Sequence, residues 1–583
     1  MATAPLAAWA VQRAVLPLTL NGVVKGEVLA VLRDEDVLVR GADLEAAGLQ
    51  NVAGRRESIG GETFISLGSL SPALHYQLDP QALALNVTAE PTLLASTALN
   101  LGAARPSGID DRADPSAFFN YGVTWRDFGR VDPFGEAGLS VAGSLLSSTF
   151  LRTRDGDLAR GLSSLTMDER QGLRRWVIGD SFAGAGGLGG SAFIGGLSVA
   201  RNFSLNPYFV RYPTFGLSGA VLTPSTVDVY VNDVFIRREE LPPGPFELRN
   251  LPATAGSGAT RFVIRDALGR QQDITSPYYL STSVLAQGLS EYGYSAGLRR
   301  DVDAGGLGRY SSPVFLGQHR IGVTDSLTTG LRLEAASALV SGGPAVNLRL
   351  PLGELELAGA ASHDAGVSGA AGSIAYGYVG RRVSFGSLAR GLSPRYSTVS
   401  LTPEQDRALI ETSAFAGFQL SSRATVTVFE NVSDFRDKGW MNRPGVSTTF
   451  LLTKQASLFL SVSRLVARPS GSSDAELTAF AGISYYFGSN TTGELFHEQA
   501  DARGSTGIEL QRTLGAGTGF GYRLQGRGGD GTDGMGGMVE YQGPWGRYEI
   551  AHDRLDGKDA TTVSAAGGVV AIGGSLHATR PVE

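Results

Sequence analysis

Apolar residues recur at every second position in segment after segment of this chain, from about residue 116 onward. The pattern is clear in Tyr292-x-Tyr294-x-Ala296-x-Leu298, Ala424-x-Val426-x-Val428, Leu458-x-Leu460-x-Val462 and Tyr548-x-Ile550. A two-residue period predicts strands with one apolar face and one polar or small face. A soluble β-sandwich would show the same alternation, but its repetition over about four hundred residues favours a transmembrane β-barrel.

The composition agrees with a barrel. The sequence holds no run of eighteen apolar residues, so it predicts no transmembrane helix, and a chain of this kind can span a membrane only as a closed barrel. Glycine numbers 79 of 583 residues, well above average usage, which fits tightly turning sheets better than a helical enzyme. The fold class expected is therefore all-β.

The length sets the number of strands. Segments 116–222 and 284–580 together hold about 400 residues, and a membrane strand with its turn takes roughly seventeen, so about 24 strands are expected, six of them before residue 223. Asp155-Gly156 and Asp556-Gly557 are hairpin signals within these segments.

Residues 223–283 interrupt the barrel pattern. Val227, Val229 and Val231 alternate with polar residues up to the turn pair Asn232-Asp233. Three prolines in 241–245 exclude a helix there, and a second alternating strand, 259–266, ends at the turn Gly269-Arg270. This segment predicts a β-sandwich module of its own, inserted into the barrel.

A small mixed β domain is expected at the start of the chain, over 16–92. Leu16, Leu18 and Leu20 alternate up to the turn Asn21-Gly22, and further short strands follow a short helix at 43–47. Residues 1–15 are an N-terminal tail in this interpretation. Segment 93–115, rich in Ala, Gly, Asp and Pro, predicts a linker.

Several motifs, in order along the chain, resemble those of fimbrial ushers, the outer-membrane assembly channels of the chaperone–usher pathway. The inserted module resembles the usher plug in Pro224–Asn232, Gly244-Pro245-Phe246, Asp266–Arg270 and Leu285-x-x-Gly288-Leu289. Arg175-Trp-Val-Ile-Gly-Asp180 and Gly196–Phe203 resemble the barrel strands that precede the plug. Usher barrels have 24 strands and carry the plug between the sixth and the seventh. Residues 16–92 resemble the N-terminal periplasmic domain of these proteins.

The resemblance implies a location, partners and a function. The chain is expected in the outer membrane, in contact with its lipid, with a periplasmic fimbrial chaperone and pilin subunits as partners and a homodimer as a further expectation. It would recruit chaperone–pilin complexes on 16–92, catalyse their ordered polymerisation and secrete the fibre through the plugged pore. Leu16, Leu18 and Leu20 are predicted to contact those complexes, with the alternative that they are the core of the first strand. The motif residues expected in the plug are Val229, Val231, Asn232, Gly244, Pro245, Phe246, Asp266, Gly269 and Arg270.

We have one expectation for each end of the sequence. Ala4–Val11 is apolar but lacks a preceding positive charge and a clear cleavage site, so we expect a signal that has been removed or a misassigned start. Ushers usually continue into two C-terminal periplasmic β domains. Here 569–579 is typical of a final strand and 581–583 follow it, so we expect either a truncated sequence or a variant that works without those domains.

No catalytic, metal or cofactor site is expected, and the chain is predicted not to be an enzyme. Gly184–Gly189 fits a dinucleotide-binding pattern but lacks the helix that must follow, so a hairpin or extracellular loop is predicted. Gly528–Asp533 has one copy of a calcium-repeat pattern that works only when stacked. The six histidines lack ligand spacing, cysteine is absent, and a net charge of −6 argues against nucleic acid as a partner.

Two other functions stay open. A plugged porin or transporter for small molecules explains the strands but gives no role to the inserted module or to residues 16–92. A soluble multidomain adhesin would lack apolar bands that face lipid.

Overall fold

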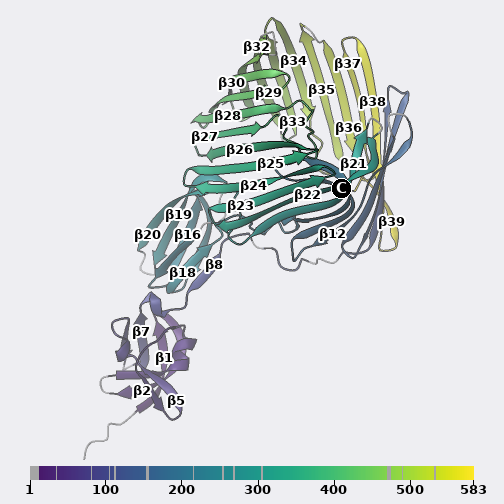
Figure 1. Ribbon diagram of the computed structural model, residues 1–583. Coiled ribbons are helices and arrows are strands. Elements are labelled where there is room, and N and C mark those ends of the chain that lie inside the picture. The colour runs from purple at the N-terminus through teal and green to yellow at the C-terminus, as the bar shows by residue number, and fades with distance from the viewer. Residues whose placement is uncertain are drawn as a thin grey trace, which may run out of the picture. The chain divides into compact units, whose positions relative to one another are not determined.

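The computed structural model describes residues 12–33, 36–79, 82–103, 105–109, 113–152, 156–214, 216–251, 255–266, 270–303, 306–468, 474–488, 490–530 and 533–582. The chain divides into two compact units (Figure 1). One unit comprises Met1–Arg105 and Thr214–Leu280, and the other comprises Pro106–Pro213 and Ser281–Glu583. The apolar run at Ala4–Val11, Asp155 of the first hairpin signal and Gly269 of the plug motif lie outside the described residues.

Strands dominate both units, which confirms the all-β prediction. In the described part of the chain, helical structure consists of α1 (Gly41–Ala46) and three 3-10 turns, η1 (Gly68–Leu70), η2 (Pro91–Leu93) and η3 (Phe203–Leu205). Across the described ranges, no helix is both long enough and apolar enough to cross a membrane.

The second unit is a closed barrel of 24 strands, as predicted, with six strands before residue 214 and eighteen after residue 280. Successive strands pair antiparallel with their neighbours along the chain, and Figure 1 shows their colours following one another around the wall. The first six are β9 (Ser116–Arg126), β10 (Arg130–Val141), β11 (Ser144–Arg152), β12 (Leu158–Glu169), β13 (Arg174–Gly184) and β14 (Ser191–Arg201). The next nine are β21 (Ser290–Asp303), β22 (Gly306–Thr324), β23 (Leu327–Ala336), β24 (Leu339–Leu350), β25 (Gly353–Asp364), β26 (Val367–Val379), β27 (Val383–Leu392), β28 (Ala408–Ser421) and β29 (Ala424–Phe435). The last nine are β30 (Gly439–Leu451), β31 (Ala456–Arg468), β32 (Asp474–Gly488), β33 (Thr491–Ala500), β34 (Arg503–Arg512), β35 (Gly519–Gly529), β36 (Gly534–Gln542), β37 (Gly546–Leu555) and β38 (Lys558–Ile572).

The ring closes where β38 pairs with β9, with Thr562 opposite Arg126 and Ile572 opposite Ser116. The short strand β39 (Ser575–Thr579) pairs with the last five residues of β38, beyond the part that pairs with β37. Closure leaves the wall without an open sheet edge, which is the condition for a sheet to lie in lipid.

Strand direction defines two ends of the barrel. The near end is the one at which β9 begins, and the opposite one is the far end. Because the strands alternate in direction, β14 finishes and β21 starts at the near end, so both connections to residues 214–280 leave from there. The β13–β14 connection at 185–190 and the β27–β28 connection at 393–407 lie at the far end.

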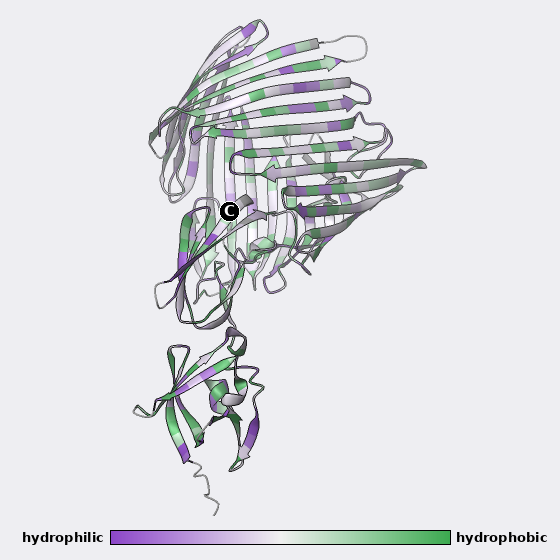
Figure 2. Ribbon diagram, turned by 90° about the vertical axis from the view of Figure 1, so that its left-hand side faces the viewer, coloured by the Kyte–Doolittle hydropathy of each residue, from purple (hydrophilic) through white to green (hydrophobic). Residues whose placement is uncertain are grey.

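The barrel wall reverses the burial pattern of a soluble sheet. In β23, Leu331 and Leu333 are 64% and 45% exposed, whereas the alternating residues Arg332 and Glu334 are buried. Figure 2 shows the resulting short hydrophobic and hydrophilic bands along the barrel strands. Apolar residues therefore face outward and polar ones inward, as in a membrane barrel and unlike a soluble adhesin.

The N-terminal part of the first unit is a seven-stranded sheet in the order β4-β5-β3-β2-β1-β7-β6. Its strands are β1 (Gln12–Leu20), β2 (Val23–Arg33), β3 (Asp36–Arg40), β4 (Arg56–Ile59), β5 (Glu62–Ser66), β6 (Leu74–Asp79) and β7 (Ala84–Ala89). The core contains Leu16, Leu18, Leu44 and Leu85. This is the small mixed β domain that the alternation at the start of the chain predicts.

Residues 214–280, together with 97–100, form two sheets around a second core. One sheet has the order β17-β16-β19-β20 and the other β15-β18-β8. Their bounds are β8 (Thr97–Asn100), β15 (Leu217–Val221), β16 (Ser225–Val231), β17 (Val234–Leu241), β18 (Gly244–Arg249), β19 (Gly256–Asp266) and β20 (Gln271–Leu280). The sequence pattern predicts 217–221 as part of the barrel and 97–100 as part of a linker, whereas in the structure both segments pair with β18.

Candidate functional site

Polar side chains of β12, β13, β21, β22 and β23 meet one another across strands of the barrel wall. Glu334 points inward, whereas the pairing of Asp180 with Gly195 and of Gly195 with Leu298 places Asp180 on the outward face. Two clusters result, one around Asp180 and one around Glu334. They lie on the strands that flank the interruption of the barrel by 214–280.

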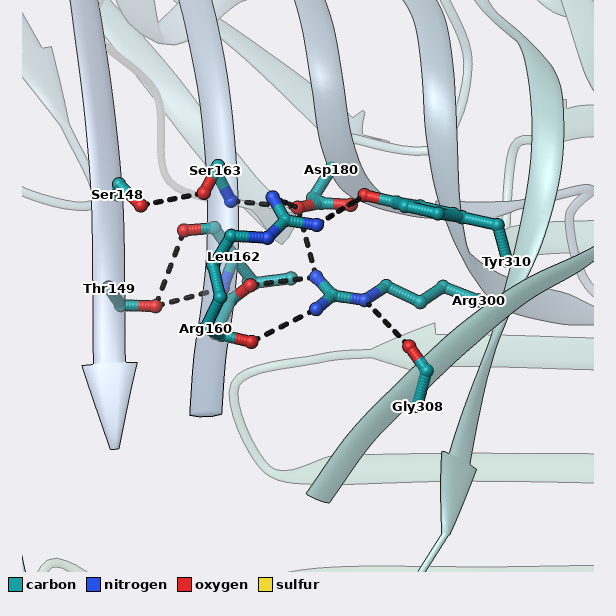
Figure 3. Close-up of polar contacts among 10 residues, drawn as sticks. Ser148, Thr149, Arg160, Leu162, Ser163, Asp180, Arg300, Gly308 and Tyr310 are labelled. Atoms are coloured by element: carbon teal, nitrogen blue, oxygen red, sulfur yellow. Dashed lines mark hydrogen bonds and ion pairs between the residues drawn. The ribbon is translucent and has the colours of Figure 1, made fainter. Parts of the chain in front are cut away.

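Asp180 on β13 is the centre of the first cluster (Figure 3). Its Oδ2 accepts hydrogen bonds from Arg300 Nη1 at 2.9 Å, Arg160 Nη1 at 3.0 Å and the Ser163 backbone N–H at 2.9 Å. Its Oδ1 accepts from the Tyr310 hydroxyl at 2.6 Å. Because the side chains of Asp180 and Arg300 are both almost completely buried, each charge depends on these partners for its solvation.

Glycine on the intervening strand makes these contacts geometrically accessible. Asp180 and Arg300 lie on β13 and β21, with β14 between them. A Cβ added at Gly195 of β14 would come within 2.2 Å of the Tyr310 ring. The absence of a side chain at this position therefore lets Tyr310 from β22 lie over β14 and reach Asp180.

Arg300 completes the cluster through backbone carbonyls. Its Nη1 donates to the Gly161 carbonyl at 2.7 Å and its Nη2 to the Arg160 carbonyl at 3.0 Å, both on β12. The cluster thus joins β12 and β13, which precede residues 214–280, to β21 and β22, which follow them. A carboxylate saturated with donors in this way is suited to hold strands in place and has no free lone pair for acid–base chemistry.

Glu334 on β23 is the centre of the second cluster. Its Oε2 accepts from the backbone N–H groups of Gly190 and Val399, each at 3.1 Å, and its Oε1 pairs with Arg332 at 3.0 Å. Gly190 belongs to the β13–β14 connection and Val399 to the fifteen-residue β27–β28 connection, 393–407. One buried carboxylate therefore joins two far-end loops to the inner wall.

Tyr396 anchors the β27–β28 connection to the barrel wall. Its side chain is buried, its hydroxyl donates to the Leu188 carbonyl at 2.6 Å, and Arg332 donates to the same hydroxyl. A Cβ at Gly369 of β26 would lie 2.4 Å from the Tyr396 Cα, and one at Gly190 would lie 2.8 Å from the Val399 nitrogen. The loop is therefore packed against backbone, and these two glycines allow the close approach.

We name the segment 393–400 together with the hairpin tip 185–190 the luminal clasp. An apolar cluster supports it, which includes Ala185, Ile194, Leu316 and Val399. A cavity of about 540 Å³ lies beside the tip, lined by polar side chains of the inner wall that include Gln318, Arg320, Asn347, Glu356 and Arg390. The luminal clasp thus covers part of the inner wall. Charged side chains that water can reach lie beside it.

The two connections that lead to residues 214–280 are seated on the near end of the barrel. The Ala286 N–H donates to the Arg211 carbonyl at 3.0 Å, which joins the incoming connection to the outgoing one. Arg320 pairs with Glu291 at 2.9 Å, and the Leu285 N–H donates to Thr328 Oγ1 at 2.8 Å. Any hinge for the inserted module therefore falls close to the unit boundaries at 213/214 and 280/281.

The predicted plug residues occupy three kinds of position in the inserted module. Val229, Val231 and Phe246 are buried. Asn232 has a φ of +51° in the hairpin turn and accepts from the Ala259 N–H through its side chain. Asp266 and Arg270 close a turn, with the Arg270 N–H donating to Asp266 Oδ1 at 2.9 Å.

Gly244 and Pro245 begin β18. Gly244 has a φ of +129°, and a Cβ there would meet the Ala95 carbonyl at 3.1 Å. Pro245 pairs with Ala220 of β15. These motif residues build the module and do not converge on one binding surface.

Asp228 belongs to no motif in the sequence that predicts a special role for it. Its carboxylate is buried within the sheet and pairs with Arg238 and Arg265 at 2.5 and 2.7 Å. The hydrogen bond from Arg238 and the neighbouring guanidinium charges hold the pKa of Asp228 below its usual range, against the effect of burial. Its polar position in an alternating strand, opposite two arginine-containing strands, is the only signal in the sequence.

Leu16, Leu18 and Leu20 are buried in the core of the N-terminal domain. The structure thus places them where the alternative interpretation of the first strand did. Their predicted contact with chaperone–subunit complexes has no exposed side-chain surface to use in this conformation.

The glycine-rich and histidine motifs considered for other chemistry lie mostly in strands and turns, and Gly531 and Thr532 of one motif lie outside the described residues. Residues 184–189 end β13 and turn back toward β14. Among the described residues, no group of three or more His, Cys, Asp or Glu side chains is arranged to hold a metal ion. His497 contacts Thr506 across a strand pair at 2.9 Å.

Residues 175–335 match the family described as outer membrane usher protein. The chain is 27% identical over 193 residues to the outer membrane usher protein FimC of Bordetella pertussis, over 33% of this chain and 22% of that protein. It is 30% identical over 129 residues to the F1 capsule-anchoring protein of Yersinia pestis, over 22% of this chain and 15% of that protein. The chain therefore covers less than a quarter of the length of these curated relatives.

A solved structure extends the likeness to nearly the whole chain. With 14% identity and a TM-score of 0.62, 97% of this chain aligns with 76% of a chain in the cryo-EM structure of the E. coli P pilus tip assembly intermediate PapC-PapD-PapK-PapG in the second conformation. At this identity the likeness concerns the fold.

Proposed function

Because this chain belongs to the outer membrane usher family and lies in the outer membrane, we propose that it assembles and secretes a fimbrial fibre. In this proposal it recruits complexes of a periplasmic chaperone with pilin subunits on residues 16–92. It catalyses their ordered polymerisation, and the fibre leaves through the barrel once 214–280 no longer blocks the pore. It acts as an assembly platform and not as an enzyme with a reactive side chain.

The observation that carries the proposal is the interruption of a 24-strand barrel between its sixth and seventh strands by a folded module. A barrel of this size encloses a lumen wide enough for folded protein, in contrast to the side-chain-filled interior of small barrels. Such a pore must be kept closed when idle, which gives the inserted module a role as a plug. A porin for small molecules has no need of either the width or the separate N-terminal domain.

Energy for polymerisation can come from the subunits themselves. Strand addition to an open sheet edge forms backbone hydrogen bonds and buries apolar side chains, so exchange of a chaperone strand for a pilin strand can run downhill without a nucleotide. The saturated cluster around Glu334 agrees with a static inner wall along which subunits pass. Outward leucines such as Leu331 and Leu333 would contact lipid, and a homodimer remains a prediction.

Co-expression in Gram-negative cells tests the proposal. The chain is produced together with a periplasmic fimbrial chaperone and its pilin subunits, and pilin on the cell surface is measured by its accessibility to added protease. We expect surface pilin with the intact chain and none when 16–92 are deleted, while the barrel of the deletion variant still shows heat-modifiable migration on a gel. Surface pilin independent of this chain would contradict the proposal.

Conductance separates the usher from the alternative transporter. Deletion of 214–280 should leave a folded barrel and convert it into a wide open pore in planar bilayers. If the deletion variant and the intact chain conduct equally, the module does not block the lumen. If the intact chain conducts and takes up a small solute selectively but assembles no fibre, the transporter function holds.

A further inference from the structure

The segment between the N-terminal domain and the barrel contains a strand of the plug. Thr97–Asn100 (β8) pairs parallel with Phe246–Arg249 of β18, in a continuous register (Figure 1). The ladder continues past the strand, since the Leu101 N–H donates to the Arg249 carbonyl at 2.8 Å. Asn250 donates through its side chain to Asn100 Oδ1 at 3.1 Å.

Apolar contacts make this strand part of the plug core. Leu101 is buried in the same cluster as Val227, Phe246 and Leu248, and Leu99 packs against that cluster. Two side chains of the segment thus fill space that residues 214–280 leave open. The burial of Leu101 and the partial burial of Leu99 favour docking of this segment on the plug and oppose the entropy cost of closing the loop.

The connection on the other side of β8 is very short. Leu94 is buried in the core of the N-terminal domain, and Ala95 donates to the Gly48 carbonyl of that domain at 3.0 Å. Ala95 and Ser96 alone separate the two cores along the chain before β8 begins. Toward the barrel, in contrast, fourteen residues, 102–115, lie between the last plug contact and β9, and they can span at most about 50 Å.

We propose that residues 97–102 join the N-terminal domain and the plug into one moving body. Displacement of the plug then carries the N-terminal domain with it, and the number of residues between Leu101 and β9 limits how far the pair can move from the barrel. The coupling would link the binding of a subunit to the N-terminal domain with the opening of the pore by the plug. The strand pairing itself does not depend on the proposed function, whereas this consequence rests on it.

Disulfide trapping tests the pairing in the full-length protein, which has no cysteine of its own. Ala98 and Glu247 are opposite each other in adjacent strands and outside the core, at a separation of about 4.8 Å that a disulfide can bridge. Ser218 pairs with Glu247 from the other side, so Ala98 and Ser218 are about 9.6 Å apart and too distant for a disulfide. The variant Ala98→Cys/Glu247→Cys should oxidise in the outer membrane with loss of both free thiols. The matched control Ala98→Cys/Ser218→Cys should retain them.

Fibre assembly by the oxidised variant then tests the coupling. If the two domains move as one body, surface pilin stays at the level of the intact chain with the disulfide closed. Absence of the disulfide in the paired variant would overturn the pairing. Assembly that stops on oxidation and returns with reductant would overturn the one-body coupling, because the strands must then separate in each cycle. Failure of the intact chain to assemble fibres would instead reject the proposed function and leave the cross-linking result standing.

Discussion

Asp180 on β13 and Arg300 on β21 form a buried ion pair of 2.9 Å that spans the intervening strand β14. The pair connects strands on the two sides of the plug insertion, where 80 or more residues of sequence separate neighbours in the wall. The β14–β21 pairing at this place cannot rely on a short hairpin to fix its register. We infer that the pair, with Tyr310 and Arg160, fixes the position of β14 relative to β21. Apart from the closing pair of β38 and β9, this is the place where paired barrel strands are far apart in the sequence.

Replacement of Asp180 should weaken the barrel. Asp180→Asn leaves Arg300 buried without its counter-charge, and loss of one member of a buried pair costs about 3–5 kcal/mol. We expect the urea midpoint of the detergent-solubilised barrel, followed by heat-modifiable migration, to fall accordingly. Glu169→Gln is the matched control, since Glu169 and its partner Arg174 are both over 40% exposed and such pairs contribute about 1 kcal/mol or less. Equal midpoints for the two variants would contradict the assigned role.

Gly190 and Gly359 provide a second comparison within the barrel. Gly190→Ala would place a methyl group 2.8 Å from the Val399 nitrogen and should displace the luminal clasp, whereas a Cβ at Gly359 meets no atom within 4 Å. We expect Gly190→Ala to expose 393–407 to added protease and Gly359→Ala to behave as the unaltered chain. Both variants should keep heat-modifiable migration. Protection of the loop in Gly190→Ala would show that it can shift without leaving the wall.

The barrel was predictable because its signal is repeated. Alternation such as Leu458-x-Leu460-x-Val462 occurs in strand after strand, and the residue count then fixes about 24 of them. β8 was not predictable in the same way. Thr97–Asn100 is four residues long, lies within a stretch typical of a linker, and pairs with a partner about 150 positions away.

The luminal clasp and the Asp180 cluster escaped prediction for a related reason. Tyr396 and Arg300 lie at positions where the sequence shows only a loop and an ordinary polar strand residue. Their importance arises from tertiary contacts across several strands, such as Tyr396 with Leu188. Glycines at 190, 195 and 369 make these contacts sterically accessible, yet in a chain with 79 glycines no single one stands out.

The plug should lose stability in acid through Asp228. The folded state lowers the pKa of this carboxyl, so its contribution is complete above the ordinary carboxyl pKa and is lost as the pH falls toward the lower, folded value. We expect hydrogen-exchange protection of 225–231 in the full-length protein, corrected for the intrinsic rate, to be constant from pH 7 to about 5 and to decline below about pH 4. Asp228→Asn should lower the protection at pH 7 and remove the decline. Glu247→Gln, which alters a carboxylate paired with Arg249 at the surface, should change neither.

Leu18 decides between the core and the interface roles of the first strand. Its side chain is fully buried, so Leu18→Asp would place an unpaired charge in the N-terminal core and should unfold that domain. Val24→Asp is the control, because Val24 lies on the adjacent strand and is 74% exposed. In the full-length protein we expect hydrogen exchange across 12–89 to lose its protection in Leu18→Asp only, and binding of chaperone–subunit complexes to be lost with it. Lost binding with intact protection in Leu18→Asp would instead assign the leucine to the interface, which would require β1 to move from its buried position when the complex binds.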